Sequence, residues 1–230
     1  MKKVNKDKTC VIEVDGHKYE RWAIQTKLIE ASDNILEVVK EFALPEMIAG
    51  DIILISEKAL ACTQSRAIPL DEINPRPLAK FLSKYVTKSP YGIGLSMPET
   101  MEMALRECGT PRILFAAIIS AIGKVFGQRG VFYVVAGSKA KSIDGPCDHT
   151  IEPYNHYVVL GPENPKEAAK KIKEETGYDA AIIDANDLGI DILGSYGNVD
   201  EELVKKIWVG NPLGQAGEQT PFGLIRPVQS

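Results

Sequence analysis

Apolar and polar positions alternate in short blocks along this chain, and the blocks predict a mixture of strands and helices. Short apolar or alternating runs bounded by turn residues are typical of strands. Such runs occur at Thr9–Asp15, Tyr19–Thr26, Ile52–Ser56, Val131–Ala136, Tyr157–Leu160 and Ala180–Asp184. Gly16-His17 between the first two predicts a hairpin. Because strands and helices mix without strict alternation, we expect an α/β class with a mixed sheet.

Apolar residues at helical spacing predict the helices. They fall at Asn34–Phe42, Leu78–Val86, Pro98–Gly109, Arg112–Phe126, Lys166–Thr176 and Val199–Trp208. Arg112–Phe126 is apolar on most faces and indicates a buried helix, with a strand beginning near Ile113 as the alternative. Asn211–Pro227 is rich in Gly, Pro and Gln, which predicts an irregular tail. We expect one domain over residues 1–230, made of two closely packed subdomains with a boundary near residues 88–98, where Pro and Gly cluster.

Composition and charge bear on whether the protein binds nucleic acid or associates with a membrane. Hydrophobic residues make up 44% of the 230 residues, charged residues 25%, and the formal net charge is -4. This balance and the lack of a long Lys/Arg tract speak against nucleic-acid binding. The longest apolar run, Ile113–Ile122, has about half the ~20 residues that span a bilayer, and the basic start lacks the apolar core of a signal peptide. We therefore expect no membrane association.

Four widely spaced cysteines and three histidines show no zinc-ligand spacing. The cysteines are Cys10, Cys62, Cys108 and Cys147. Without a disulfide framework, they indicate reduced thiols in a cytoplasmic protein.

Two acidic segments carry the strongest candidate chemistry. AAIIDAND runs an apolar block straight into Asp184, and SIDGPCD places Asp144 shortly after the predicted strand Val131–Ala136. Carboxylates at strand ends meet at the rim of an open sheet, where α/β folds hold ligands and hard cations. If the two aspartates converge, the pattern predicts Mg²⁺ or Mn²⁺ beside phosphates. Each aspartate alone also suits a helix cap or a turn.

Four basic side chains are candidates for binding phosphate or carboxylate. Lys58 and Arg66 follow the strand Ile52–Ser56, and Lys139 and Lys141 precede Asp144. Arginine suits bidentate contacts with oxyanions, although ordinary solvated positions explain these cations equally well.

Two further polar residues are candidates. Asn186 lies just beyond Asp184. Glu218 lies in a tail rich in amides and glycine, a composition that is equally typical of a loop without a ligand. The sequence contains no GxxxxGK[ST], GxGxxG or GxSxG pattern, so a nucleotide would need another binding device.

The order of five segments resembles the coenzyme F420-0:gamma-glutamyl ligase family. The segments are IQTKLIEASDNILEVV, GDIILISEKALACTQSR, FYVVAGSKAKSIDGP, VVLGPENPKEAAKKI and AAIIDAND. Lys58 and Arg66 match the family's basic pair, and Asp144 and Asp184 match its two metal-binding aspartates. The resemblance implies a mixed α/β fold, a homodimer, and GTP-dependent addition of glutamate to a carboxylate through an acyl-phosphate.

The resemblance also implies Mg²⁺ or Mn²⁺ as cofactor, GTP or ATP as co-substrate, and a small-molecule carboxylate and an amino acid as partners. It assigns catalysis to Lys58 and Arg66, cofactor contacts to Lys139, Lys141 and Asn186, and metal binding to Asp144, Asp184 and Glu218.

Two departures from the family pattern bear on the substrate. Gly145-Pro146-Cys147 replaces the family's Ser-Asn, and Leu188-Gly189-Ile190-Asp191 stands where the family has an arginine-bearing Gly-Arg-Pro segment. Both fall on the acceptor side of the expected site. A nucleotide- or metal-binding protein without catalysis, and a ligase for folate-type or peptide carboxylates, are the alternatives.

Overall fold

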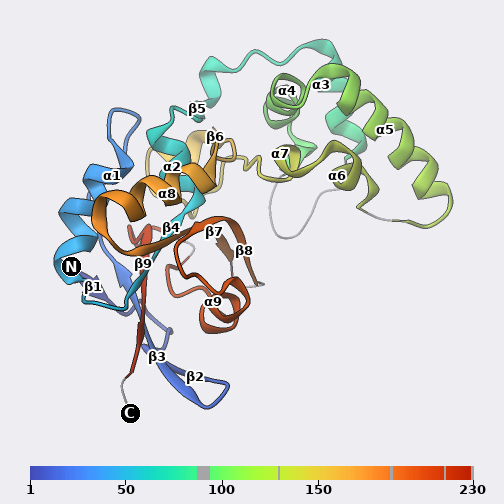
Figure 1. Cartoon of the computed structure of the whole chain (residues 1–230). Helices are drawn as coiled ribbons and strands as arrows, with labels where there is room; N and C mark the ends of the chain where they lie inside the picture. Colours follow the sequence, from blue (N-terminus) through green and yellow to red (C-terminus); the bar gives the residue numbers. More distant parts are fainter. Residues whose placement is uncertain (87–93, 129, 187–188, 215, 229–230) are drawn as a thin grey trace. The chain divides into compact units, whose positions relative to one another are not determined.

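The computed structural model describes residues 1–86, 94–128, 130–186, 189–214 and 216–228 (Figure 1). Its contacts group into two compact units. The first unit comprises Met1–Ser65 and Pro162–Ser230, and the second comprises Arg66–Gly161. The boundary expected near residues 88–98 is not one of these division points; it falls within the second unit, and residues 87–93 lie outside the described ranges.

A mixed sheet forms the centre of the first unit. Its described strands are β1 (Lys2–Lys3), β2 (Val11–Val14), β3 (His17–Ile24), β4 (Ile52–Ser56), β7 (Asp179–Asn186), β8 (Gly189–Tyr196) and β9 (Phe222–Pro227). The strand order is β1-β3-β9-β4-β7-β8, and β2 also pairs with β3. β4 and β7 run parallel, whereas β3 and β7 pair antiparallel with β9 and β8 respectively. The mixed α/β class and the hairpin at Gly16 are confirmed.

The first unit also contains helices, from both its N-terminal and its C-terminal segment. They are α1 (Ile35–Val38), a π-helical turn (Val39–Ala43), a 3-10 turn (Leu44–Glu46), α2 (Glu57–Thr63), α8 (Pro165–Thr176) and α9 (Glu201–Ile207). Asn34 caps α1 by accepting the Leu36 amide at 2.9 Å, and Asp200 caps α9 by accepting the Leu203 amide at 3.0 Å. The helical segments predicted in this unit are confirmed to within a few residues.

Trp208 anchors the core of the first unit. It is 1% exposed and packs with Leu54, Ile183 and Ile207. Its indole ring leaves no room for a Cβ on Gly223 of β9. Glycine at this position therefore lets the ring lie directly against the strand.

The second unit is mostly helical. Its helices are α3 (Pro77–Leu82), α4 (Pro98–Glu107), α5 (Thr110–Val125), α6 (Val131–Ala136) and α7 (Ser138–Lys141). Its 3-10 turns are Leu70–Glu72, Ser83–Tyr85, Gly94–Ser96 and Tyr154–His156, and its strands β5 (Ala67–Pro69) and β6 (Tyr157–Val159) pair antiparallel. Leu95, Met101, Ile113 and Val158 are completely buried in its core.

The strand predicted at Val131–Ala136 is wrong, because these residues form helix α6. Gly130, with φ of 77°, and Gly137, with φ of 94°, bracket the helix. Strand propensity largely measures how a side chain fits a pleated surface, and α6 packs against α5 instead. Tertiary packing therefore overrides the β-rich composition.

The irregular tail predicted over Asn211–Pro227 is also wrong in part. Phe222–Pro227 forms β9, which lies between β3 and β4 in the sheet (Figure 1). Strands from the two ends of the sequence are thus neighbours, a long-range pairing that local composition does not reveal.

Arg112–Phe126 is helical as predicted, as α5, but the expectation that this helix is buried is wrong. Ile113 is fully buried, whereas Phe115 and Ile118 are 58% and 59% exposed. The helix therefore has an inner and an outer apolar side.

No single helix in the described ranges is long and apolar enough to cross a membrane. α4 and α5 reach that length and composition only as a pair, with a bend of 118° between them.

Candidate functional site

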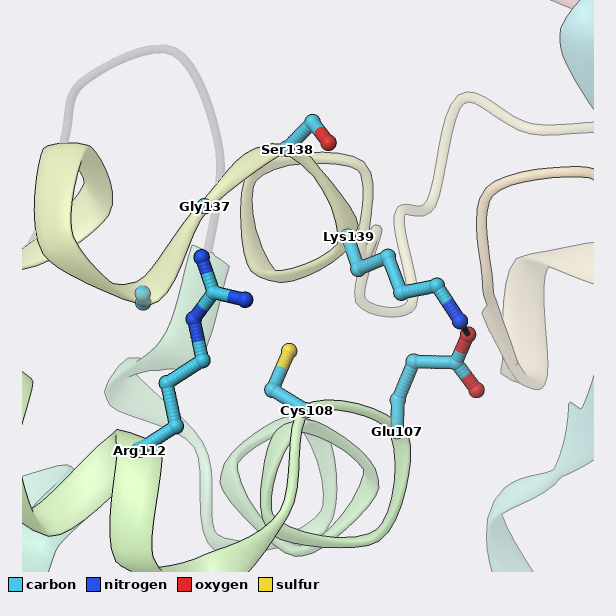
Figure 2. Close-up of a pocket in the computed structure, with 7 residues that line it drawn as sticks. Glu107, Cys108, Arg112, Gly137, Ser138 and Lys139 are labelled. Atoms are coloured by element: carbon cyan, nitrogen blue, oxygen red, sulfur yellow. Dashed lines mark ion pairs between the residues drawn. The ribbon is translucent and has the colours of Figure 1, made fainter.

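Charged side chains gather around Glu107 in the second unit. Glu107 ends α4, Lys139 lies in α7, and Arg66 directly precedes β5. Arg66 Nη2 lies 2.6 Å from Glu107 Oε1. Lys139 Nζ lies 3.2 Å from the same oxygen (Figure 2). Arg66 and Lys139, both predicted site residues, are thus brought together by a carboxylate that the sequence did not single out.

Arg66 is the fixed member of this cluster. Its Nε donates to the Gly161 carbonyl at 2.5 Å, and its own carbonyl accepts the Leu160 amide at 2.9 Å. The side chains of Arg66 and Glu107 are each 13% exposed, whereas that of Lys139 is 63% exposed. Solvent therefore reaches the cluster mainly through Lys139.

The charges decide the protonation state of the residues at the end of α4. Burial raises the pKa of Glu107, but hydrogen bonds from Arg66 and Lys139 outweigh burial and hold this pKa below its ordinary value of 4.5. Burial raises the pKa of Cys108, and the Glu107 charge raises it further, against the opposing effects of Arg112 and Lys139. At neutral pH Glu107 is therefore a carboxylate and Cys108 a thiol, not the thiolate that nucleophilic attack requires.

A pocket of about 260 Å³ lies beside the cluster. It is lined by Glu107, Cys108, Arg112, Ala136, Gly137, Ser138 and Lys139 (Figure 2). Pockets for drug-sized ligands occupy roughly 300–1,000 Å³. This pocket therefore has room for one carboxylate- or phosphate-bearing group rather than for a whole nucleotide.

Arg112 reaches into this pocket from α5 (Figure 2). Its Nε donates to the Val135 carbonyl at 3.3 Å. Gly137 has φ of 94°, and a Cβ there would lie 2.6 Å from Arg112 Nη2. The backbone conformation therefore favours glycine at this position, and its lack of a side chain lets the guanidinium lie close to the chain. A guanidinium with a lysine and the Ser138 hydroxyl nearby suits a bound oxyanion.

Asp144 and Lys141 also lie in the second unit. Asp144 is half-buried, and its backbone exchanges two hydrogen bonds with Val159 of β6, each 2.9 Å long. Lys141 is exposed at the end of α7. Asp144 is therefore anchored beside β6, after the helices α6 and α7, and the expectation that it follows a strand is wrong.

Three predicted residues lie near the sheet of the first unit. Lys58 is exposed on α2. β7 continues past Asp184 to Asn186, so Asp184 lies within the strand, opposite Asp191 of β8. Asn186 Oδ1 accepts the Gly189 amide at 3.1 Å. The acidic end of β7 is thus part of a hairpin rather than a free loop at a sheet rim.

Glu218, predicted as a metal ligand, stabilises its own loop. Its Oε2 accepts the Ala216 amide at 2.7 Å, and its carbonyl accepts a hydrogen bond from Lys3 at 3.0 Å. These contacts order the segment that leads into β9.

The predicted metal site draws on both units, because Asp144 lies in the second and Asp184 in the first. Their convergence stays a prediction. Across the ranges that the structure describes, no group of three or more His, Cys, Asp or Glu side chains is arranged to hold a metal ion. We derive no reaction step through a metal.

Comparison with known proteins identifies the family. The family model described as F420-0:Gamma-glutamyl ligase matches residues 23–186, more than two thirds of the chain. This chain belongs to the F420-0:gamma-glutamyl ligase family. The match runs from the end of β3 to the end of β7 and contains the whole second unit, including the Glu107 cluster.

A curated relative gives a second comparison. The coenzyme F420:L-glutamate ligase of Methanopyrus kandleri is 26% identical over 159 residues, which cover 67% of this chain and 54% of that protein. The chain thus spans about half the length of the curated relative it matches.

Sequence reasoning missed Glu107 and Arg112. Glu107 resembles any carboxylate on an amphipathic helix, and Arg112 resembles a cation at the start of an apolar helix. Only the packing of α4 and α5 with α6 and α7 places these two side chains around one pocket. The nearest signal in the sequence is the glycine at position 137. In the structure it has a positive φ and lies close to the Arg112 side chain.

Proposed function

We propose that this chain has amide-bond-forming ligase activity, joining the amine of an amino acid to a substrate carboxylate. The observation that supports this most directly is the family match over residues 23–186. From the resemblance we include GTP or ATP as phosphoryl donor, an acyl-phosphate intermediate, and Mg²⁺ or Mn²⁺ as cofactor.

The proposed reaction has two steps. A carboxylate oxygen attacks the terminal phosphorus, and the nucleoside diphosphate leaves. The amine nitrogen then attacks the acyl carbon, and phosphate leaves as the nitrogen loses a proton. Both steps build negative charge on oxygen atoms, which positioned cations and hydrogen-bond donors stabilise.

The pocket beside Glu107 offers such donors. Arg112 and Lys139 present cationic donors in a space sized for one carboxylate or phosphate group. The Arg66–Glu107 pair keeps Glu107 in place, and Glu107 in turn holds the lysine ammonium. In this role Arg66 and Glu107 are positioning residues, and the other two contact the ligand.

The remaining assignments are part of the proposal. Lys58 serves catalysis directly, Arg66 serves it by positioning Glu107, and Lys141 and Asn186 contact the nucleotide. Asp144, Asp184 and Glu218 are the proposed metal ligands. The chain acts as a cytoplasmic homodimer, without nucleic acid or membrane.

A coupled assay tests the ligase. The full chain is incubated with GTP or ATP, Mn²⁺ or Mg²⁺, and panels of amino acids and carboxylates, while phosphate release and amide products are followed by mass spectrometry. We expect nucleotide consumption that depends on one acceptor and one amine. Nucleotide that stays intact with every combination would contradict the proposal.

A matched pair of variants tests the metal assignment. Asp184→Asn should abolish metal-dependent turnover while the circular dichroism spectrum is retained. Asp200→Asn is the control, because it removes the same charge in the same unit and Asn caps a helix as well as Asp does. Full activity in the Asp184 variant would remove this residue from the site.

A second candidate is a protein that binds nucleotide without catalysis. The observation in its favour is β8, which begins at Gly189 where the family carries its arginine-bearing segment. Tight nucleotide binding without turnover, measured by calorimetry in the same conditions, would support this candidate over a ligase for folate-type or peptide carboxylates.

A further inference from the structure

Arg112 lacks the carboxylate partner that most other arginines of the chain have. Four arginines form ion pairs of 2.6–2.9 Å, which join Arg66 to Glu107, Arg76 and Arg106 to Glu102, and Arg226 to Asp51. Within the described ranges Arg112 forms no ion pair, and its hydrogen bond runs from Nε to the Val135 carbonyl at 3.3 Å. Its two Nη groups therefore remain available to a ligand in the pocket.

The other donors of the pocket lie around the same space. Figure 2 shows the Arg112 guanidinium on one side of Cys108 and the Lys139 ammonium on the other. The ammonium contacts Glu107 Oε1 at 3.2 Å, which occupies one of its three N–H donors. Ser138 also lines the pocket. A ligand placed there meets a guanidinium, an ammonium and a hydroxyl from different directions.

The charge of the cluster favours a phosphate group over a carboxylate. Arg66, Arg112 and Lys139 bring three positive charges to the pocket and its wall. Glu107 brings one negative charge, which leaves a net charge of +2. Cys108 adds none, because burial raises its pKa and it stays a thiol. A phosphate group carries about −1.5 to −2 charges at pH 7, whereas a carboxylate carries a single one, so phosphate comes closer to neutralising the cluster.

The arrangement of the donors favours the same ligand. A phosphate group offers three strong acceptor oxygens that point in different directions, whereas a carboxylate offers two in one plane. Gly137 brings the donors together, because a Cβ there would lie 2.6 Å from Arg112 Nη2. Without this Cβ the guanidinium lies against the chain directly before Ser138. Donors on several sides of one small space suit a tetrahedral oxyanion.

The size of the pocket limits how much of the ligand it holds. Its volume of about 260 Å³ is below the roughly 300–1,000 Å³ of pockets for drug-sized molecules. The pocket therefore suits a phosphate group that is not attached to a nucleoside. The proposed reaction produces such a group twice, in the acyl-phosphate and as the phosphate that leaves it.

We infer that the pocket between Arg112 and Lys139 binds the phosphate group after it has left the nucleotide, first within the acyl-phosphate and then as inorganic phosphate. The inference rests on the proposed function and names the ligand of its pocket. When the amine nitrogen attacks the acyl carbon, the bond from that carbon to the phosphate oxygen breaks, and its electron pair stays on the oxygen. Cationic donors stabilise this charge. Because the same donors bind the free ion, released phosphate should inhibit turnover.

Titration of the full chain with inorganic phosphate, without nucleotide, tests the pocket directly. Calorimetry and phosphorus NMR line widths measure the binding. We expect saturable binding that an equal concentration of acetate does not displace. Tighter binding of acetate or of L-glutamate than of phosphate would assign the pocket to a carboxylate and overturn the inference.

Substitutions then locate the binding. Arg112→Gln should weaken phosphate binding at least about 10-fold, because charge-assisted hydrogen bonds are lost. Arg112→Lys should also weaken it, because an ammonium does not reproduce the guanidinium fork. Equal binding by the wild type and Arg112→Gln would overturn the inference. Lys139→Gln, at a side chain that is 63% exposed, gives a second test in case Arg112→Gln does not fold by circular dichroism.

Lys124→Gln is the matched control. It removes one positive charge from the same helix, and Lys124 lies outside the pocket, where it donates to the Tyr85 carbonyl at 2.9 Å. Phosphate binding should be unchanged in this variant. A loss as large as that of Arg112→Gln would mean that the ion responds to overall charge rather than to the pocket, which contradicts the inference.

Turnover measurements separate this inference from the proposed function. Nucleoside diphosphate and amide product are followed while phosphate is added, and we expect inhibition that is weaker in Arg112→Lys than in the wild type. Turnover that saturating phosphate does not slow overturns the inference while the ligase stands. A chain that binds phosphate through Arg112 but shows no turnover contradicts the ligase while the phosphate pocket stands. A chain that does neither overturns both.

Discussion

Removing the charge of Glu107 tests the centre of the proposed site most directly. Glu107→Gln keeps the shape of the side chain and one oxygen acceptor, but leaves Arg66 and Lys139 without their shared carboxylate. Breaking a fully buried ion pair costs about 3–5 kcal/mol, whereas a surface pair contributes about 0–1 kcal/mol. Because Arg66 and Glu107 are each 13% exposed and the amide retains a hydrogen bond, we expect a loss of about 2 kcal/mol. For a chain of this size that is a fall in Tm of about 4–8 °C.

The same variant has a defined pH signature. The pKa of Glu107 is lowered in the folded state, because the hydrogen bonds from Arg66 and Lys139 outweigh the effect of burial. Its stabilising contribution is therefore present above the ordinary value of 4.5 and is lost as the pH falls through the folded-state pKa. The difference in unfolding free energy between wild type and Glu107→Gln should be constant near neutral pH and should shrink in acid.

Urea unfolding followed by circular dichroism at several pH values measures this difference. Glu72→Gln is the control, since Glu72 is an exposed carboxylate in the same unit, and its loss should change stability by less than about 0.5 kcal/mol. An equal effect of the two substitutions, or a Glu107 effect that persists undiminished in acid, would refute the reasoning.

Three further outcomes follow from local geometry. Gly137→Ala should lower stability by about 1–3 kcal/mol in thermal unfolding, because φ of 94° is a backbone conformation that suits glycine and strains other residues. Asp200→Ala should cost about 1 kcal/mol in urea unfolding, because α9 loses its N-cap. Cys147, which is exposed, should react with iodoacetamide before Cys108, whose pKa is raised by burial, as read by mass spectrometry of the modified peptides.

Each of these outcomes has its own control or contradiction. Gly189→Ala, where a Cβ meets open space, should be nearly neutral, and an equal loss there would remove the argument from Gly137. Asp200→Asn should retain the stability that the alanine variant loses. Preferential labelling of Cys108 would mean that its thiol is activated, contrary to the pKa direction that burial sets.

Local signals in the sequence were sufficient where they agree with the final packing. β4 matches its predicted bounds, and α8 (Pro165–Thr176) begins one residue before the predicted helix Lys166–Thr176 and ends at the same residue. The strand β9 was missed because its partners lie far away in the sequence. The helix α6 was missed because its packing against the preceding helix α5 overrides a β-rich composition. Propensity describes a segment alone, whereas the pairing surface available in the fold decided both.

In the candidate site, too, some residues could be predicted from local sequence signals and others depend on packing. Lys139 was identified because it lies just before the acidic segment of Asp144, and Arg66 because it matches the basic pair of the family that the sequence resembles. Glu107 and Arg112 were not, because their roles arise only when α4, α5 and α7 are brought together. The union of Asp144 with Asp184 stays a prediction, since the two aspartates belong to separate units.

The position of β9 imposes an order of assembly during synthesis. Residues 66–161 are contiguous, so the helical unit can collapse as soon as it leaves the ribosome. By contrast, the N-terminal hairpin and the strands β4, β7 and β8 are joined into one sheet only by β9, which pairs with both β3 and β4. They cannot form this sheet until residues 222–227 have been synthesised. Until then the nascent chain exposes two unpaired strand edges that can pair wrongly, so the addition of β9 removes two sites of potential aggregation.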